Sequence, residues 1–261
     1  MTTESPLLLT DTVDGVVTLT LNRPDQFNSL SEELLDALQR SLDAIAQDDD
    51  VRCVVLAGNG RAFCAGHDLK QMRARPDQAY YAQLFAQCGR VMQSIVSLPV
   101  PVIAKVHGTA TAAGCQLVAS CDLAIAADTA RFAVSGINVG LFCSTPAVAL
   151  TRNVPAKKAF EMLVTGQFIS AQDAADNGLI NRAVPPEQLD AEVDALVSVI
   201  CSKSPVAVRT GKGMVHRQRG MSLCDAYDYA GEVMACNMMT EDVAEGIDAF
   251  MQKRHPVWKG R

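Results

Sequence analysis

The sequence predicts an α/β fold, and three observations carry this prediction. Short apolar segments that are typical of strands alternate with helical periodicities through the first half of the chain. Downstream of Pro155 the patterns are mostly helical. In addition, 49% of the 261 residues are hydrophobic, which is enough for a large core. We therefore expect one continuous domain, with a core at 1–200 and a helical region at 201–261.

Five segments are predicted to be strands. In 16–21, VVTLTL, valine and leucine alternate with threonine, as in a strand that is buried on one face. The apolar run at 53–57 predicts a strand that is buried on both faces. Three further strands are predicted at 102–106, 122–127 and 179–184.

Helical periodicity begins at Ser31, after which Leu34, Leu38, Leu42 and Ile45 recur every three or four residues. Ser29 and Glu32 have the spacing of a capping box for this helix. A helix rich in small residues is predicted at 113–121. Further helical patterns follow at 156–165, 170–176, 187–203, 206–216 and 221–253.

Composition and charge argue against several functions. Lys and Arg number 23 against 29 Asp and Glu, and the net charge of −6 would repel nucleic acid and anionic lipid. Nine cysteines without a C-x-x-C pair, and four scattered histidines, fit neither a disulfide framework nor a metal site. No stretch has the pattern of a secretory signal or a membrane span. We expect reduced thiols, a cytoplasmic location, and no metal, nucleic-acid or membrane partner.

Two segments have small residues clustered at turns, namely 63–69 (FCAGHDL) and 107–115 (HGTATAAGC). Small side chains leave backbone N–H groups accessible, and these groups carry partial positive charge at a helix N-terminus. Two such donors from different loops can stabilise one oxygen as it becomes negative, for example when a thioester becomes an enolate. The alternative is that the glycines and alanines only permit tight turns and close helix packing.

Four blocks in order along the chain resemble the enoyl-CoA hydratase/isomerase, or crotonase, superfamily. They are NRPDQFNSLS at 22–31, GRAFCAGHDLKQM at 60–72, PVIAKVHGTATAAGCQLVASCDLAIA at 101–126 and EGIDAFMQKRHPVW at 245–258. Within this superfamily, FCAGHDL, VGLFCSTPAVAL and FMQKRHPVW are most similar to the branch called enoyl-CoA hydratase domain-containing protein 3.

This resemblance implies a crotonase-like spiral of ββα units, followed by helices that form a homotrimer or a dimer of trimers. It implies an oxyanion hole made by the N–H groups of His67 and Ala113, with Gly114 beside the second. Coenzyme A would be part of the acyl-CoA substrate, with no tightly bound cofactor. The resemblance assigns its contacts to Ala65, Asp68, Leu69 and Lys70, to Gln26 and Phe27 at the pantetheine entrance, and to Phe250 and Lys253, which close over the nucleotide from a neighbouring subunit.

The catalytic carboxylates of the family are missing from the aligned positions. Gln116 stands where hydratases have one glutamate, and Gly136 stands where they have the other. An amide cannot take a proton from water at neutral pH, so we expect slow hydration. Decarboxylation needs chiefly an enolate hole, with His67 or Asn138 orienting the carboxylate. The tyrosine used in that reaction is replaced by Cys143.

Two hypotheses remain open. The first is an enzyme, hydratase-like by family, that binds acyl- or enoyl-CoA and stabilises an enolate. The second is a CoA-thioester-binding protein with little turnover, or a decarboxylase-like activity. The His67 side chain either faces the substrate or caps the following turn. Lys212, Arg217 and Arg219 form a basic cluster that either contacts a phosphate or is the solvated end of a helix, and we favour the second interpretation.

Overall fold

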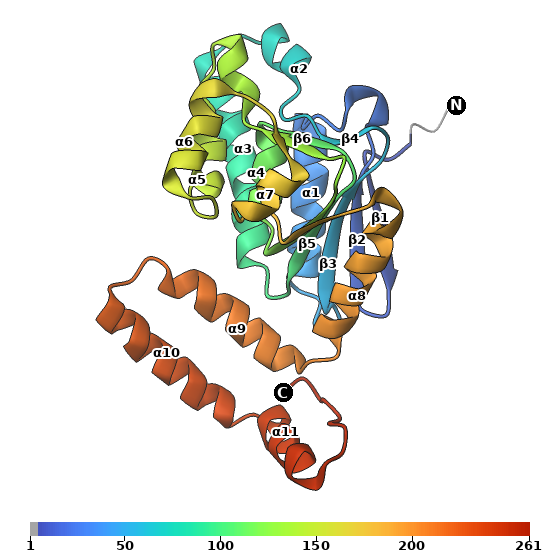
Figure 1. Ribbon diagram of the computed structural model, residues 1–261, viewed down its shortest axis with the longest axis vertical. Coiled ribbons are helices and arrows are strands. Elements are labelled where there is room, and N and C mark those ends of the chain that lie inside the picture. The colour runs from blue at the N-terminus through green and yellow to red at the C-terminus, as the bar shows by residue number, and fades with distance from the viewer. Residues whose placement is uncertain (1–4) are drawn as a thin grey trace.

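The computed structural model describes residues 5–261 as two sheets with helices around them and a helical arm at the C-terminal end (Figure 1). The larger sheet has the strand order β1-β2-β3-β5-β7-β10. Its β1–β2 pair is antiparallel and the other pairs are parallel. The strands are β1 (Leu8–Val13), β2 (Val16–Leu21), β3 (Cys53–Gly58), β5 (Val102–Val106), β7 (Leu123–Ala127) and β10 (Arg182–Val184).

The smaller sheet has the order β4-β6-β8-β9 and consists of very short strands. Only its β8–β9 pair is antiparallel. The strands are β4 (Ala62–Cys64), β6 (Thr109–Thr111), β8 (Arg131–Ala133) and β9 (Ile169–Ser170). The pairs β3–β4, β5–β6 and β7–β8 each give one strand to each sheet before the chain enters a helix. The fold is therefore the ββα spiral that the resemblance implies.

Eleven α-helices and three short 3₁₀ segments complete the part of the chain that the structure describes. The 3₁₀ segments are η1 (Pro24–Gln26), η2 (Ser135–Val139) and η3 (Pro186–Gln188). The α-helices are α1 (Glu32–Ile45), α2 (Leu69–Ala74), α3 (Gln78–Ser97), α4 (Ala113–Ser120), α5 (Ser144–Leu150), α6 (Ala156–Thr165), α7 (Ala171–Asp176), α8 (Leu189–Cys201), α9 (Pro205–Gln218), α10 (Leu223–Met238) and α11 (Glu241–Gln252).

Both faces of the central strands of the larger sheet are buried. One face joins the main core, which includes Leu19 of β2, Leu38 of α1 and Leu117 of α4. The opposite face packs against α8 through a second apolar cluster that contains Ile103 and Val193. This two-sided burial explains why β3 is a continuous apolar run and β5 is interrupted only by Lys105, whereas β2 alternates between buried and half-buried residues.

Several predicted elements differ from the observed ones. The predicted capping box is wrong, because α1 is capped by Ser31, whose hydroxyl accepts from the Leu34 N–H. The hydroxyl of Ser29 instead accepts from Arg23. The predicted strand at 179–184 is shorter, covering only β10, and the pattern at 221–253 is two helices, because Thr240 caps a new one.

Helix α3 was not predicted, although a signal was available. Its buried residues Tyr80, Leu84, Cys88, Val91 and Ile95 recur every three or four positions. Strand β1 was also missed, because its residues are mostly exposed and lack an alternating pattern. The antiparallel partner of β2 was therefore absent from the predicted sheet.

The C-terminal helices form an arm that extends away from the sheets (Figure 1). In the single chain, each residue of α9 and α10 taken as a whole is half-buried or exposed. The Lys212 side chain is only 6% exposed, which contradicts its interpretation as part of a solvated helix end. Its ammonium donates to the carbonyls of Ile95 and Val100 and lies 2.7 Å from the Asp122 carboxylate. This contact attaches α9 to the core.

Candidate active site

The first donor loop follows β4 and is shaped by Gly66. Gly66 has φ +93°, in the region that favours glycine. The backbone on both sides of His67 is hydrogen-bonded to Leu30, because the Leu30 N–H donates to Gly66 O at 2.8 Å and the Asp68 N–H donates to Leu30 O at 3.1 Å. The N–H of His67 itself has no hydrogen-bond partner among residues 5–261.

The second donor loop joins β6 to α4. Ala112 precedes the helix with φ +50° and ψ −119°, a conformation that costs a non-glycine residue of the order of 1–3 kcal/mol. Ala113 begins α4, so its N–H has no partner inside the helix. No other described residue accepts a hydrogen bond from it.

The two donor loops touch each other. A Cβ atom at position 66 would lie 2.8 Å from the Ala112 Cβ and 3.3 Å from the Ala113 nitrogen. A Cβ atom at position 114 would lie 2.0 Å from the Cys64 carbonyl oxygen, so only glycine fits there. Because Gly66 and Gly114 have no side chains, the start of α4 can pack directly against the first loop.

A cavity of about 290 Å³ adjoins both loops. Its lining is mostly apolar, and among the described residues it contains no Asp, Glu, Lys or Arg side chain. Residues from the first loop, α2 and α3 form one part of the wall, while the second loop, η2 and the start of α5 form the rest. The lining is Ala65, His67, Leu69, Met72, Phe85, Ala112, Ala113, Ser135, Gly136, Val139, Leu141, Phe142, Cys143, Ser144, Thr145 and Pro146.

The His67 imidazole packs edge-on against Phe85, with 5.5 Å between the ring centroids. Neither ring nitrogen reaches a hydrogen-bond partner among the described residues. Burial lowers the pKa of His67 to about 4, with the Leu30 carbonyl acting in the opposite direction. The ring is therefore neutral at pH 7. Of the two alternatives for this side chain, capping of the following turn is wrong, since Asp68 caps α2.

The residues at the two glutamate positions differ in their surroundings. Gln116 on α4 is 4% exposed and is not among the cavity residues, and its Oε1 has no partner in the described chain. Gly136 lines the cavity, but a Cβ there would lie 2.6 Å from Leu141 O and 2.7 Å from the Cys143 sulfur. Burial raises the pKa of the Cys143 thiol. Asn138 is not part of the lining, and its amide approaches Gly166 O at 3.4 Å.

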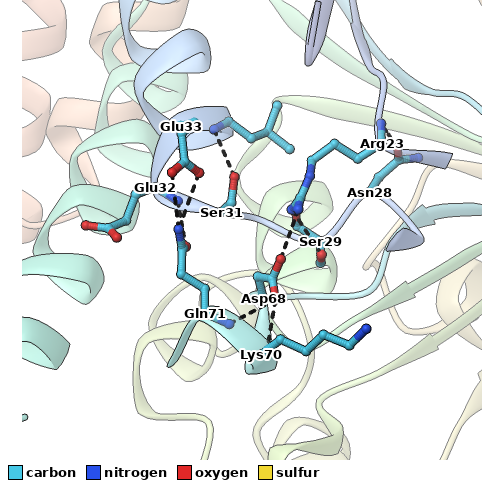
Figure 2. Close-up of polar contacts among 10 residues, drawn as sticks. Arg23, Asn28, Ser29, Ser31, Glu32, Glu33, Asp68, Lys70 and Gln71 are labelled. Atoms are coloured by element: carbon cyan, nitrogen blue, oxygen red, sulfur yellow. Dashed lines mark hydrogen bonds and ion pairs between the residues drawn. The ribbon is translucent and has the colours of Figure 1, made fainter. Parts of the chain in front are cut away.

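Asp68 connects the first donor loop to α2 and to Arg23 (Figure 2). One carboxylate oxygen accepts from the N–H groups of Lys70 and Gln71 and so caps α2, while the other lies 2.9 Å from the Arg23 guanidinium. Burial alone would raise the pKa of Asp68, but the hydrogen bonds from Arg23 and the α2 amides lower it. Lys70 is exposed at the start of α2 and is not among the cavity residues.

The remaining predicted contacts lie outside the cavity. Gln26 and Phe27 belong to the η1 turn, where Phe27 O accepts from the Ala65 N–H at 3.0 Å. Phe250 is 84% exposed on α11, and Lys253 ends that helix with φ +56°. Helix α11 lies at the far end of the arm, away from α4 and α5 (Figure 1). The single chain therefore does not bring Phe250 and Lys253 to the cavity.

Sequence reasoning missed Arg23 and Asn28 as supports of the first loop. The Asn28 side chain is fully buried, with its oxygen accepting from the Arg23 N–H and its amide donating to the carbonyls of Asn59 and Ala62. Both residues lie in the block at 22–31 that carried the family resemblance, which was the available signal. Within residues 5–261, no three His, Cys, Asp or Glu side chains gather as metal ligands, and no helix is long and apolar enough to cross a membrane.

Comparison with known proteins agrees with this architecture. The model of the Enoyl-CoA hydratase/isomerase family matches residues 11–261. The chain belongs to this family. Among solved structures, an enoyl-CoA hydratase from Mycobacterium smegmatis is 60% identical, with a TM-score of 0.96 and coverage of 97% of this chain and 99% of the other. Human enoyl-CoA hydratase domain-containing protein 3 is 43% identical, with a TM-score of 0.94 and coverage of 97% and 100%.

Curated relatives confirm the resemblance to the branch named above and correct one prediction. Mitochondrial enoyl-CoA hydratase domain-containing protein 3 of Xenopus laevis is 46% identical over 254 residues, which cover 97% of this chain and 86% of the relative. The relatives of this name from rat and human are mitochondrial as well. The predicted cytoplasmic location is therefore wrong. Reduced cysteines argue against an oxidising compartment, but they do not distinguish one reducing compartment from another.

Proposed function

We propose that the cavity binds the acyl part of a CoA thioester and that the N–H groups of His67 and Ala113 hold the thioester oxygen. The observation that carries this proposal is the pair of unpaired N–H groups on two touching loops, next to an apolar cavity. Two N–H donors without protein partners, on different loops that line one cavity, can hold the same ligand oxygen.

Such a pair stabilises the negative charge that develops when a thioester becomes an enolate. Each donor of this kind contributes about 10²–10³ in rate, because the charge forms in a site that excludes water. In this proposal Ala65, Leu69 and Lys70 lie along coenzyme A, which is part of the substrate. Phe250 and Lys253 complete the site from a neighbouring subunit of a homotrimer or a dimer of trimers.

Two observations favour slow hydration over efficient hydration. No carboxylate lines the cavity in the described chain. The Gln116 amide cannot act as a base that takes a proton from water. A thioester-binding protein with little turnover is therefore the second candidate. Decarboxylation is less favoured, because the lining residues carry no positive charge and the Asn138 amide is directed to Gly166.

The oxyanion proposal is tested with 4-(dimethylamino)cinnamoyl-CoA, whose absorption moves to longer wavelength when its thioester oxygen accepts hydrogen bonds. We expect the native protein to bind it with a red shift. Ala113→Pro removes one donor and should abolish most of that shift. Ala156→Pro makes the same change at the first residue of α6, where proline is tolerated, and serves as control. A native red shift in folded Ala113→Pro would refute the assignment.

The rate of crotonyl-CoA hydration separates the hydratase-like enzyme from the binding protein with little turnover, because sustained hydration would contradict the second. We expect hydration by the native protein to be barely above that of a heat-inactivated sample. Gln116→Glu restores one carboxylate and should raise the rate by about 10²-fold. Gly136→Glu is unsuitable as a partner change, because its Cβ would collide with Leu141 O and Cys143. Rapid hydration by the native protein would contradict the view that the glutamates are required here.

A further inference from the structure

The first donor loop is held on a polar support that reaches three parts of the chain. Asn28 links the η1 turn to Asn59 and Ala62, at the two ends of the turn between β3 and β4. The oxygen of the same side chain accepts from the backbone N–H of Arg23 at 2.8 Å. These contacts involve buried or half-buried groups, so they fix the position of Arg23 relative to both sheets.

Arg23 in turn binds Asp68, the residue that follows His67. Its guanidinium donates to the carbonyl and the hydroxyl of Ser29 and lies 2.9 Å from Asp68 Oδ2 (Figure 2). The side chains of Arg23 and Asp68 are both 15% exposed. A half-buried guanidinium that is held at three oxygens has little freedom to move, which makes it a rigid support.

Asp68 in turn holds the backbone next to the donor. Its N–H donates to Leu30 O, while its other carboxylate oxygen caps α2. The Gly66 carbonyl and the Asp68 N–H, on either side of His67, are thus both hydrogen-bonded to Leu30, whereas the His67 N–H has no partner in the described chain. His67 and Ala113 both line the same cavity.

We propose that Arg23 is a positioning residue of the oxyanion site, which sets the direction of the His67 N–H through Asp68. This inference rests on the proposed function, since it requires a thioester oxygen between the two donors. Positioning errors of about 1 Å are enough to cost a reaction roughly 10²-fold. Arg23 therefore acts on polarisation of the bound thioester more than on its affinity.

The inference is tested with 4-(dimethylamino)cinnamoyl-CoA at concentrations that saturate each variant. The red shift then reports polarisation of the thioester carbonyl, independently of the affinity. We expect Arg23→Ala to lose at least half of the native red shift, while the Kd rises by less than about tenfold. Arg23→Lys keeps the charge beside Asp68 and should recover part of the shift. Arg182→Ala removes an arginine that pairs with Glu192 outside the site and should keep the full shift.

A second variant covers the case in which Arg23→Ala does not fold. Asp68→Asn keeps an oxygen to cap α2 but loses the ion pair, and we expect it to lose red shift as well. A native red shift in folded Arg23→Ala or folded Asp68→Asn would overturn the inference. If the native protein binds the thioester without any red shift, the proposed function fails first and the inference falls with it.

Discussion

Gly114 is the residue that allows α4 to begin against the first donor loop. Because a Cβ there would lie 2.0 Å from the Cys64 carbonyl, we expect Gly114→Ala to destabilise the protein by about 3 kcal/mol or more, as overpacking against backbone does. Gly231→Ala on α10 meets nothing within 4 Å and should be neutral or stabilising. Urea unfolding of the two variants measures the difference. A small, equal effect would show that the loops can separate.

His67 makes stability depend on pH. Burial lowers the pKa of His67 to about 4, so between about pH 6.5 and 4 the unfolded chain binds a proton that the folded chain does not. The free energy of unfolding should therefore fall as the pH falls through this window, by roughly 2 kcal/mol at pH 5 from this group. His67→Gln removes that contribution. Urea unfolding at pH 7 and pH 5 should show a smaller loss in the variant, and equal losses would contradict the prediction.

At the scale of elements, one carboxylate of the core holds two side chains of α9. Asp122 accepts from Lys212, His216 and the Val102 N–H. Burial lowers the pKa of Lys212, and the adjacent Asp122 carboxylate opposes that shift. The ion pair is therefore what keeps a buried ammonium charged.

We expect Asp122→Asn to destabilise the protein by about 3 kcal/mol, because it leaves the Lys212 charge without its counter-ion. Hydrogen exchange should become faster throughout α9 before it changes in the sheets. Asp190→Asn breaks the ion pair with Lys105, in which Asp190 is 79% exposed, and should change stability by less than about 0.5 kcal/mol. Unchanged exchange in α9 would mean that other contacts hold the helix.

At the scale of the whole molecule, the arm has large apolar side chains that the single chain leaves exposed. Tyr227 is 74% and Met234 is 70% exposed, and their spacing of seven residues places them on one face of α10. Large exposed apolar patches mark sites of association. The face therefore agrees with the assembly that the family resemblance implies.

We expect the native protein to sediment as three or six copies. Tyr227→Asp combined with Met234→Asp should shift it toward single chains, because a charge cannot be buried in an apolar contact without a large cost. Glu232→Lys changes the charge on the opposite face of α10 and should leave the assembly intact. Analytical ultracentrifugation measures all three proteins, and a native protein that sediments as single chains would contradict the prediction.

The sequence by itself determined five of the six strands of the larger sheet, most of the helices and the two loops that carry the candidate donors. These features depend on local periodicity and on small residues, which are visible along the chain. Only the tertiary structure decided that the loops touch, that Asp68 is bound by Arg23 and that Lys212 is buried beside Asp122. The physical reason is that these contacts join residues 45 to 90 positions apart, and no local pattern records which distant backbone or charge a residue will meet.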